Sequence, residues 1–226
     1  MITQSILTNS KYTTPQRITD NGIRYYESSA GKFPSITTVL GCRNRGWLEQ
    51  WKANVGPDKS AAISRKASTI GSGLHLLCEH FLSNNTKELS RCLMKAMPET
   101  KVRFNNFKPF LDKITELFLS EAPLASAILK ICGTVDAFVL FDGRPTVVDF
   151  KTANRPKSAD SIKGYFAQAS FYAYAIAEQY NVPVPDIIIA IAVDGLKEPQ
   201  IFHSKPIDHI NYLLESIKMY NAGETD

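Results

Sequence analysis

Two strand-like segments joined by a tight turn, followed by a third apolar strand, most constrain the fold of this chain. The two segments span residues 130–141 and 146–151, and Asp142-Gly143-Arg144-Pro145 between them is a hairpin-turn signal. Residues 187–193 are apolar throughout, which predicts a strand that is buried on both faces. Because a helix-like segment, residues 161–180, separates the hairpin from this strand, the pattern predicts an α/β fold with a sheet between helices.

The remaining segments surround this predicted core. Helical spacing of apolar residues predicts further helices at residues 47–51, 58–83, 87–97 and 104–120. Short strands are predicted at residues 23–27 and 200–204, whereas residues 35–40 fit either a strand or a helix. A last helix begins at Pro206, with an inner face made of Ile207, Ile210, Leu213, Leu214 and Ile217.

We therefore expect one domain over residues 1–226. Its predicted parts are a loose arm (1–20), a mainly helical part (21–130), an α/β core (131–205) and a C-terminal helix (206–226). No apolar run approaches the ~20 residues of a membrane-spanning helix, and no secretory signal is evident, so a cytoplasmic protein is expected. The four cysteines form no C-x-x-C pair, which favours free thiols over a zinc or iron–sulfur site.

The net charge of +4 is unevenly distributed. Residues 1–70 carry ten Lys and Arg against four Asp and Glu, whereas the remainder carries sixteen against eighteen. A basic part beside an acidic part suits a polyanion that is held by one and acted on by the other. Charge alone, however, favours the plainer interpretation of a solvated basic surface.

Two carboxylates and a lysine lie on the predicted hairpin. Asp136 is on its first strand, and Asp149 and Lys151 end the second strand as Asp-x-Lys. Two acidic groups side by side repel each other unless a cation lies between them, and a divalent metal supplies that charge. The alternative is a surface hairpin that carries an ion pair by chance.

The order of several motifs resembles the PD-(D/E)xK nuclease superfamily and, within it, the RecB-like exonuclease branch to which phage exonucleases belong. The resemblance covers roughly residues 33–193 and is most specific at residues 133–136 and 148–152. The other matching segments are Phe33-Pro34-Ser35-Ile36-Thr37-Thr38-Val39-Leu40, Gly71-Ser72-Gly73-Leu74-His75 and the Gln-x-x-x-Tyr of Gln168 and Tyr172. It implies a restriction-endonuclease-like core with a central mixed sheet flanked by helices and an N-terminal helical extension.

The resemblance also implies roles for single residues. Asp136 and Asp149 correspond to ligands of Mg²⁺ or Mn²⁺, and Lys151 to the residue that orients water and phosphate. His75 corresponds to a further metal ligand, and Glu79 lies one helical turn later on the same face. Gln168 and Tyr172 are expected to position Lys151 or the substrate. The alternatives are a structural role for His75, a surface position for Glu79 and Gln168, and core packing for Tyr172.

The function implied is a metal-dependent DNA exonuclease that acts from free ends of single-stranded DNA in phage-type DNA processing, replication or recombination. Phosphate contacts, base stacking and close backbone approach are expected from Arg43, Arg45, Trp47, Lys52, Arg65, Lys66 and Ser72. Tryptophans are also common core residues, which is the alternative for Trp47. Two other functions stay open, namely a DNA-binding module that does not cleave and an endonuclease of the same fold.

Overall fold

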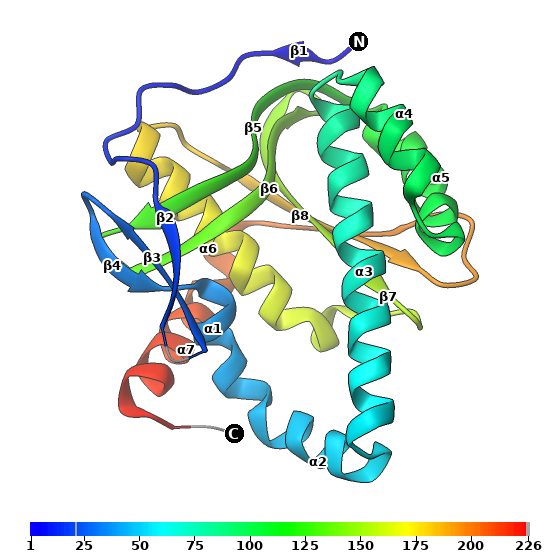
Figure 1. Ribbon diagram of the computed structural model, residues 1–226. Coiled ribbons are helices and arrows are strands. Elements are labelled where there is room, and N and C mark those ends of the chain that lie inside the picture. The colour runs from blue at the N-terminus through cyan, green and yellow to red at the C-terminus, as the bar shows by residue number, and fades with distance from the viewer. Residues whose placement is uncertain (21, 225–226) are drawn as a thin grey trace.

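The central sheet has six strands in the order β1-β5-β6-β7-β8-β9 in the computed structural model, which describes residues 1–20 and 22–224 (Figure 1). The strands are β1 (Thr3–Gln4), β5 (Ile114–Ser126), β6 (Ile131–Phe141), β7 (Arg144–Ala153), β8 (Asp186–Val193) and β9 (Gln200–Ser204). β7 and β8 are parallel and are connected by α6 (Lys163–Tyr180), whereas β5, β6 and β7 are antiparallel. The predicted hairpin, crossover helix and mixed α/β sheet are confirmed.

Helices cover both faces of this sheet. α1 (Ile36–Gly41), α6 and α7 (Ile210–Ala222) pack on one face, and α3 (Pro57–Leu82), α4 (Thr86–Lys95) and α5 (Pro98–Leu111) on the other (Figure 1). β8 contributes alternate residues to the two cores. Ile187, Ile189 and Ile191 lie in the first core, and Ile188, Ala190 and Ala192 in the second. This alternation confirms that β8 is buried on both faces.

The expected helix over residues 104–120 is wrong beyond Leu111. α5 ends there, and Ile114 begins the long strand β5. The apolar spacing in this segment fits a strand as well as a helix, and pairing with β6 along most of its length decides between them. This correction changes the site, because it places Glu121 on a strand next to Asp136.

The N-terminal part contains more strand structure than expected. β2 (Gln16–Asp20), β3 (Ile23–Ser28) and β4 (Gly31–Pro34) form an antiparallel sheet, which confirms the strand predicted at 23–27. This small sheet packs on β6, and the Tyr26 hydroxyl lies 3.1 Å from Thr134 Oγ1. Within the described residues the first helix is α1, so the part expected to be mainly helical begins with strands.

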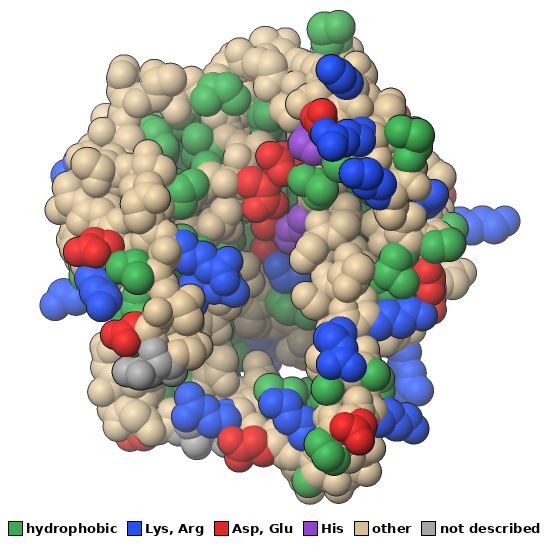
Figure 2. All heavy atoms as spheres, viewed as in Figure 1, with side chains coloured by type: hydrophobic (Ala, Val, Ile, Leu, Met, Phe, Trp, Pro, Cys, Tyr) green, Lys and Arg blue, Asp and Glu red, His purple; other side chains and the backbone are tan. Residues whose placement is uncertain are grey.

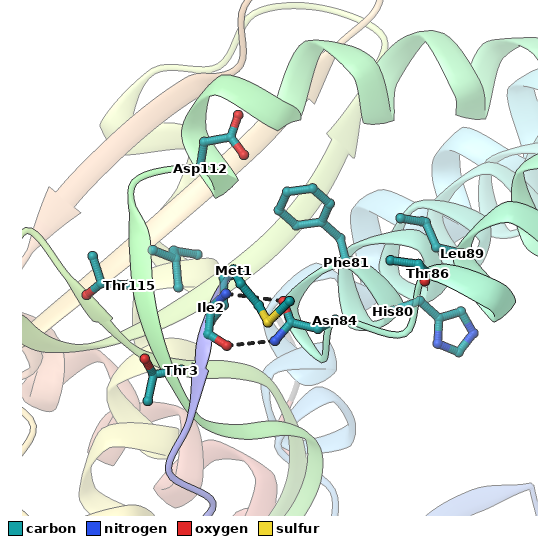
Figure 3. A pocket seen from close by; sticks show the side chains of 11 residues that line it. Met1, Ile2, Thr3, His80, Phe81, Asn84, Thr86, Leu89, Asp112 and Thr115 are labelled. Carbon is teal, nitrogen blue, oxygen red and sulfur yellow. Dashed lines mark hydrogen bonds between the residues drawn. The ribbon is translucent and has the colours of Figure 1, made fainter.

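The arm expected to be loose is anchored at its beginning. Ile2 is buried, and β1 pairs in parallel with β5. Asn84 holds the Ile2 backbone, accepting from its N–H at 3.1 Å and donating to its carbonyl at 2.6 Å (Figure 3). A pocket of about 600 Å³ adjoins this contact, and its lining contains none of the residues predicted for catalysis, metal or DNA binding.

One whole helix, α2, and the first half of another, α3, stand away from the sheet. α2 (Arg45–Val55) has no buried residue, and in the first half of α3, up to Thr69, only Ser60 is buried. α3 continues without interruption through Gly71-Ser72-Gly73, so these glycines do not end the helix. A Cβ on Gly73 would lie 3.0 Å from Thr100 Cγ2, which shows that this glycine allows close packing of α3 on α5.

The predicted C-terminal helix is present but shifted. Pro206–His209 form a 3₁₀ turn, and α7 begins at Ile210. Ile207 and Leu214 are 63% and 40% exposed, so their assignment to the inner face is wrong, whereas Leu213 is fully buried. Among the helices of the described residues, none is both long and apolar enough to cross a membrane.

Candidate active site

β6 and β7 separate at the point where the two predicted catalytic aspartates lie. Their ladder ends at the pair Ala137–Val148, beyond which β7 continues beside β8 alone. The Asp136 carboxylate replaces a ladder bond at this opening, because its Oδ2 accepts a hydrogen bond from the Phe150 backbone N–H at 2.7 Å. The separation leaves room for side chains between the strands and fixes Asp136 next to Asp149.

Asp149 and Lys151 lie two residues apart on β7, so both side chains point to the same face, the one covered by α6. Asp149 is fully buried and forms an ion pair with Lys151, whose Nζ lies 5.2 Å from the centre of the Tyr165 ring. Burial raises the pKa of Asp149 to about 6, against the attraction of Lys151 and with added repulsion from Asp136. Burial alone would lower the pKa of Lys151, but both aspartates outweigh it and the pKa is raised.

Glu121 is a site residue that the sequence interpretation missed. It lies between Ser120 and Ala122, which pair with Ala137 and Val135, so it faces Asp136 across the β5–β6 ladder. Its φ of 44° is unusual for a residue with a side chain and is a local strain of the kind found at functional sites. Its signal was an acidic residue within an apolar segment, which points to the site only once that segment is recognised as a strand.

His75 on α3 lies against both of these carboxylates. Its Nδ1 is 3.4 Å from Asp136 Oδ1 and 3.5 Å from Glu121 Oε1. Burial opposes a charged imidazole, but the charge and hydrogen bond of Asp136, together with Glu121, prevail and raise the pKa of His75 to about 10. Like charges directly opposite in a sheet are destabilising, so a protonated His75 supplies the cation that this pair requires.

The donor set fits a divalent metal. Ligand atoms of His75, Glu121 and Asp136 all lie within 4.8 Å of one another. Apart from the ion pair with Lys151, the buried oxygens of Asp149 accept no hydrogen bond from the described residues. Carboxylate oxygens with one imidazole suit Mg²⁺ or Mn²⁺. His75 and Asp136 are thus brought together as predicted, with Glu121 as their third partner.

Glu79 lies in the same hollow but outside this cluster of three. A pocket of about 510 Å³ is lined by Ser72, His75, Glu79 and Glu121, among others. Burial and the charge of Glu121 raise the pKa of Glu79. Its role as a metal ligand therefore stays a prediction. Ser72 is exposed in the lining of this hollow, and its role in DNA binding also stays a prediction.

Gln168 and Tyr172 meet each other beside Asp136, as their four-residue spacing predicts. Gln168 Nε2 donates to Tyr172 Oη at 3.0 Å. Burial and the nearby aspartates raise the pKa of Tyr172 well above its usual value. A Cβ on Gly133 would lie 2.9 Å from the Tyr172 ring and from Ile36, so only glycine allows α1 and α6 to approach β6 this closely.

Two of the residues expected to bind DNA, Arg43 and Lys66, contact other side chains of the protein. The Nε of Arg43 donates to Ser216 Oγ at 2.7 Å and its guanidinium stacks 4.2 Å from the Tyr212 ring, and its role as a phosphate contact stays a prediction. Arg43 therefore fixes the 3₁₀ turn Cys42–Asn44, which follows α1, to α7. Lys66 on α3 pairs with Glu99 at 2.9 Å but keeps 60% of its side chain exposed.

The other residues expected to contact DNA through their side chains are exposed on α2 and α3. Arg45, Lys52 and Arg65 are exposed. Trp47 is 67% exposed and stacks on Trp51, with ring centres 6.5 Å apart and planes within 13°. Core packing, the alternative for Trp47, is therefore wrong. Figure 2 shows Lys and Arg side chains around a hollow whose floor carries acidic and histidine side chains.

Comparisons with known proteins agree with this geometry. Residues 36–216 match the model of the PD-(D/E)XK nuclease superfamily, and the chain belongs to this superfamily. It is 26% identical over 157 residues to one component of the ATP-dependent helicase/nuclease of Streptococcus equi subsp. zooepidemicus (strain MGCS10565), which agrees with the RecB-like branch. That match covers 56% of this chain and only 12% of the length of that relative.

Two solved structures are similar at low sequence identity. A candidate exonuclease from Eubacterium rectale has 12% identity and a TM-score of 0.44, covering 68% of this chain and 69% of that one. The protein SSO0001 has 16% identity and a TM-score of 0.28, covering 40% of this chain and 41% of that one.

Proposed function

We propose that this protein is a metal-dependent DNA exonuclease that removes nucleotides from the free ends of single strands. The observation that carries the proposal is the convergence of Asp136, Asp149 and Lys151 with His75 and Glu121 where β6 and β7 separate. Both signs of charge required for phosphodiester hydrolysis lie there. A role in phage-type DNA processing, replication or recombination is the setting that the RecB-like motifs suggest.

The chain's own residues divide the chemistry between them. His75, Glu121 and Asp136 would hold Mg²⁺ or Mn²⁺, with Asp149 beside them, and the metal supplies a more acidic bound water and positive charge for the phosphate. Lys151 adds a fixed positive charge, positioned by Asp149 and the face of Tyr165. Because Lys151 is charged and partly buried, its charge is less screened than in water.

The preference for free ends rests on α2 and the first half of α3. These helices stand off from the body, and Figure 2 shows an open gap between them and the sheet. Exposed basic residues and the stacked tryptophans of α2 offer phosphate contacts and a surface for bases, which is the usual combination in single-strand binding. A strand that passes between these helices and the body has to enter by an end.

Linear and circular single-stranded DNA of the same sequence distinguish the candidate functions. With Mg²⁺ we expect the linear strand to be degraded to short products, the circle to persist, and EDTA to stop the reaction. Equal rates on both forms would leave a metal-dependent nuclease and remove the exonuclease assignment. Binding of both forms without cleavage under all metal conditions would instead indicate a DNA-binding module.

A further inference from the structure

A second pocket borders the metal cluster on the side away from α3. It has a volume of about 270 Å³, and Asp136 and Glu121 belong to its lining. Ile36, Gly133 and Tyr172 contribute to it from α1, β6 and α6. Its remaining charged residues are Arg17 and Arg24, which come from the small N-terminal sheet. The pocket therefore joins the acidic cluster to two cations that none of the nuclease motifs includes.

The register of β2 and β3 explains why both arginines reach this pocket. Arg17 pairs with Tyr26, and Thr19 pairs with Arg24. Directly paired residues share a face, and so do residues two apart on one strand, so Arg17, Arg24 and Tyr26 lie on the same face of the hairpin. Tyr26 fixes that face against the core through its contact with Thr134 on β6.

Neither guanidinium has a partner within the described part of the chain. Among residues 1–20 and 22–224, no ion pair or side-chain hydrogen bond is found for Arg17 or Arg24, although Lys32 on the same sheet pairs with Asp20 at 3.7 Å. Arginine presents a planar fork of donors that matches two oxygens of a phosphate. Two guanidinium groups without partners at the edge of this pocket are suited to bind an anion that extends from the metal cluster.

We propose that Arg17 and Arg24 form a phosphate-binding subsite for the DNA strand, next to the phosphate that is cleaved. The proposal rests on the proposed function and adds a second wall to the substrate path, opposite α3. The strand then runs from the exposed α2–α3 side, across the metal cluster, to the β2–β3 hairpin. Arg17 and Arg24 are positioning residues in this scheme, because they hold the substrate and take no part in proton transfer.

Binding of fluorescently labelled linear single-stranded DNA in EDTA tests the subsite without requiring cleavage. Each phosphate contact to single-stranded DNA contributes about 0.7 to the slope of log affinity against log salt concentration. We expect Arg17→Ala and Arg24→Ala each to reduce the slope by about this amount, and the double variant by roughly twice as much. Arg91→Ala on α4, whose side chain is 62% exposed, is the matched control and should leave the slope unchanged.

Cleavage kinetics provide the second measurement. The double variant should raise KM about tenfold or more with a much smaller change in kcat, since substrate is held less well while the metal cluster is intact. Circular dichroism and thermal unfolding should match the wild type, because these guanidinium groups form no ion pair or side-chain hydrogen bond within the described residues. Unchanged salt slopes and KM in the double variant, with normal folding, would overturn the proposal.

Substrate ends distinguish an internal phosphate from a terminal one. If the subsite holds a terminal phosphate, removing that phosphate from the DNA reproduces the defect in wild-type protein, and the double variant no longer distinguishes the two substrates. If it holds an internal phosphate, end phosphorylation has no effect on either protein. Wild-type protein that binds DNA with the arginine-dependent slope but never cleaves would refute the proposed function and leave the subsite standing.

Discussion

Metal binding should displace a proton from His75. Between the Asp136 and Glu121 carboxylates, the pKa of His75 is raised from 6.5 to about 10, so the imidazole is protonated at neutral pH without metal. A metal ligand has to be the neutral imidazole. Binding of Mn²⁺ at pH 7.5 is therefore expected to release close to one proton from this residue.

The cost of this displacement follows from the distance between the solution pH and the pKa. From pH 7.5 to a pKa of about 10, removing the proton costs about 3 kcal/mol, which is about a 300-fold reduction in apparent affinity. The affinity for Mn²⁺ should consequently rise about tenfold per pH unit between pH 7 and 9. Below a pH of about 6, the protonation of Asp149, whose pKa is raised to about 6, adds a second released proton.

Calorimetry in buffers of different ionisation enthalpy measures the number of protons released. His75→Gln keeps a polar group of similar reach but has no proton to lose, so release above pH 7 should vanish and the affinity should become nearly independent of pH. In EDTA, the same raised pKa stabilises the wild type fully below pH 6.5, and this contribution is lost as the pH rises through about 10. Wild-type binding without proton release at pH 7.5 would show that His75 is not displaced and would refute the argument.

Four further predictions concern the neighbouring residues. Asp149→Ala should abolish cleavage while DNA binding in EDTA survives. Lys151→Ala should lower kcat on the order of 10²-fold, because a positioned charge is lost. Wild-type cleavage rates on labelled linear DNA would contradict both predictions. Glu121→Gln should weaken Mn²⁺ binding by about tenfold or more in calorimetry, with Glu116→Gln on the same strand as a control that leaves it unchanged. Gly133→Ala should lower the free energy of unfolding by about 1–3 kcal/mol in urea titrations, because its Cβ would lie 2.9 Å from side chains on α1 and α6; an unchanged midpoint would show that these helices can shift.

The sheet was predictable from the sequence because its central strands are governed by local patterns. The β6–β7 turn has its own residue signature, and the continuous apolar run of β8 predicts a strand that is buried on both faces. The site residues on these strands were accessible for the same reason. Asp136, Asp149 and Lys151 are fixed by strand position alone, and the structure places Asp149 against Lys151 and Asp136 against the Phe150 backbone.

The remainder depends on contacts between distant segments. β5 was mistaken for the end of a helix because its apolar spacing suits both periods, and only pairing with β6 makes it a strand. The position of Glu121 in the site could therefore not be predicted from the sequence. The same holds for the hairpin that brings Arg17 and Arg24 to the site. The contacts of Arg43 could not be predicted for a related reason, since its partners Ser216 and Tyr212 lie more than 150 residues further along the chain.

In the protein without metal, two cations offset part of the negative charge of the active site. His75 and Lys151 act as two cations beside the carboxylates of Glu121, Asp136 and Asp149. Buried carboxylates without such partners would have to protonate or unfold their surroundings. The two cations are not equivalent, however, because Lys151 keeps its charge in the reaction whereas His75 gives up its proton to become a ligand. The same histidine therefore preserves the geometry of the ligands before metal binding and makes that binding dependent on pH.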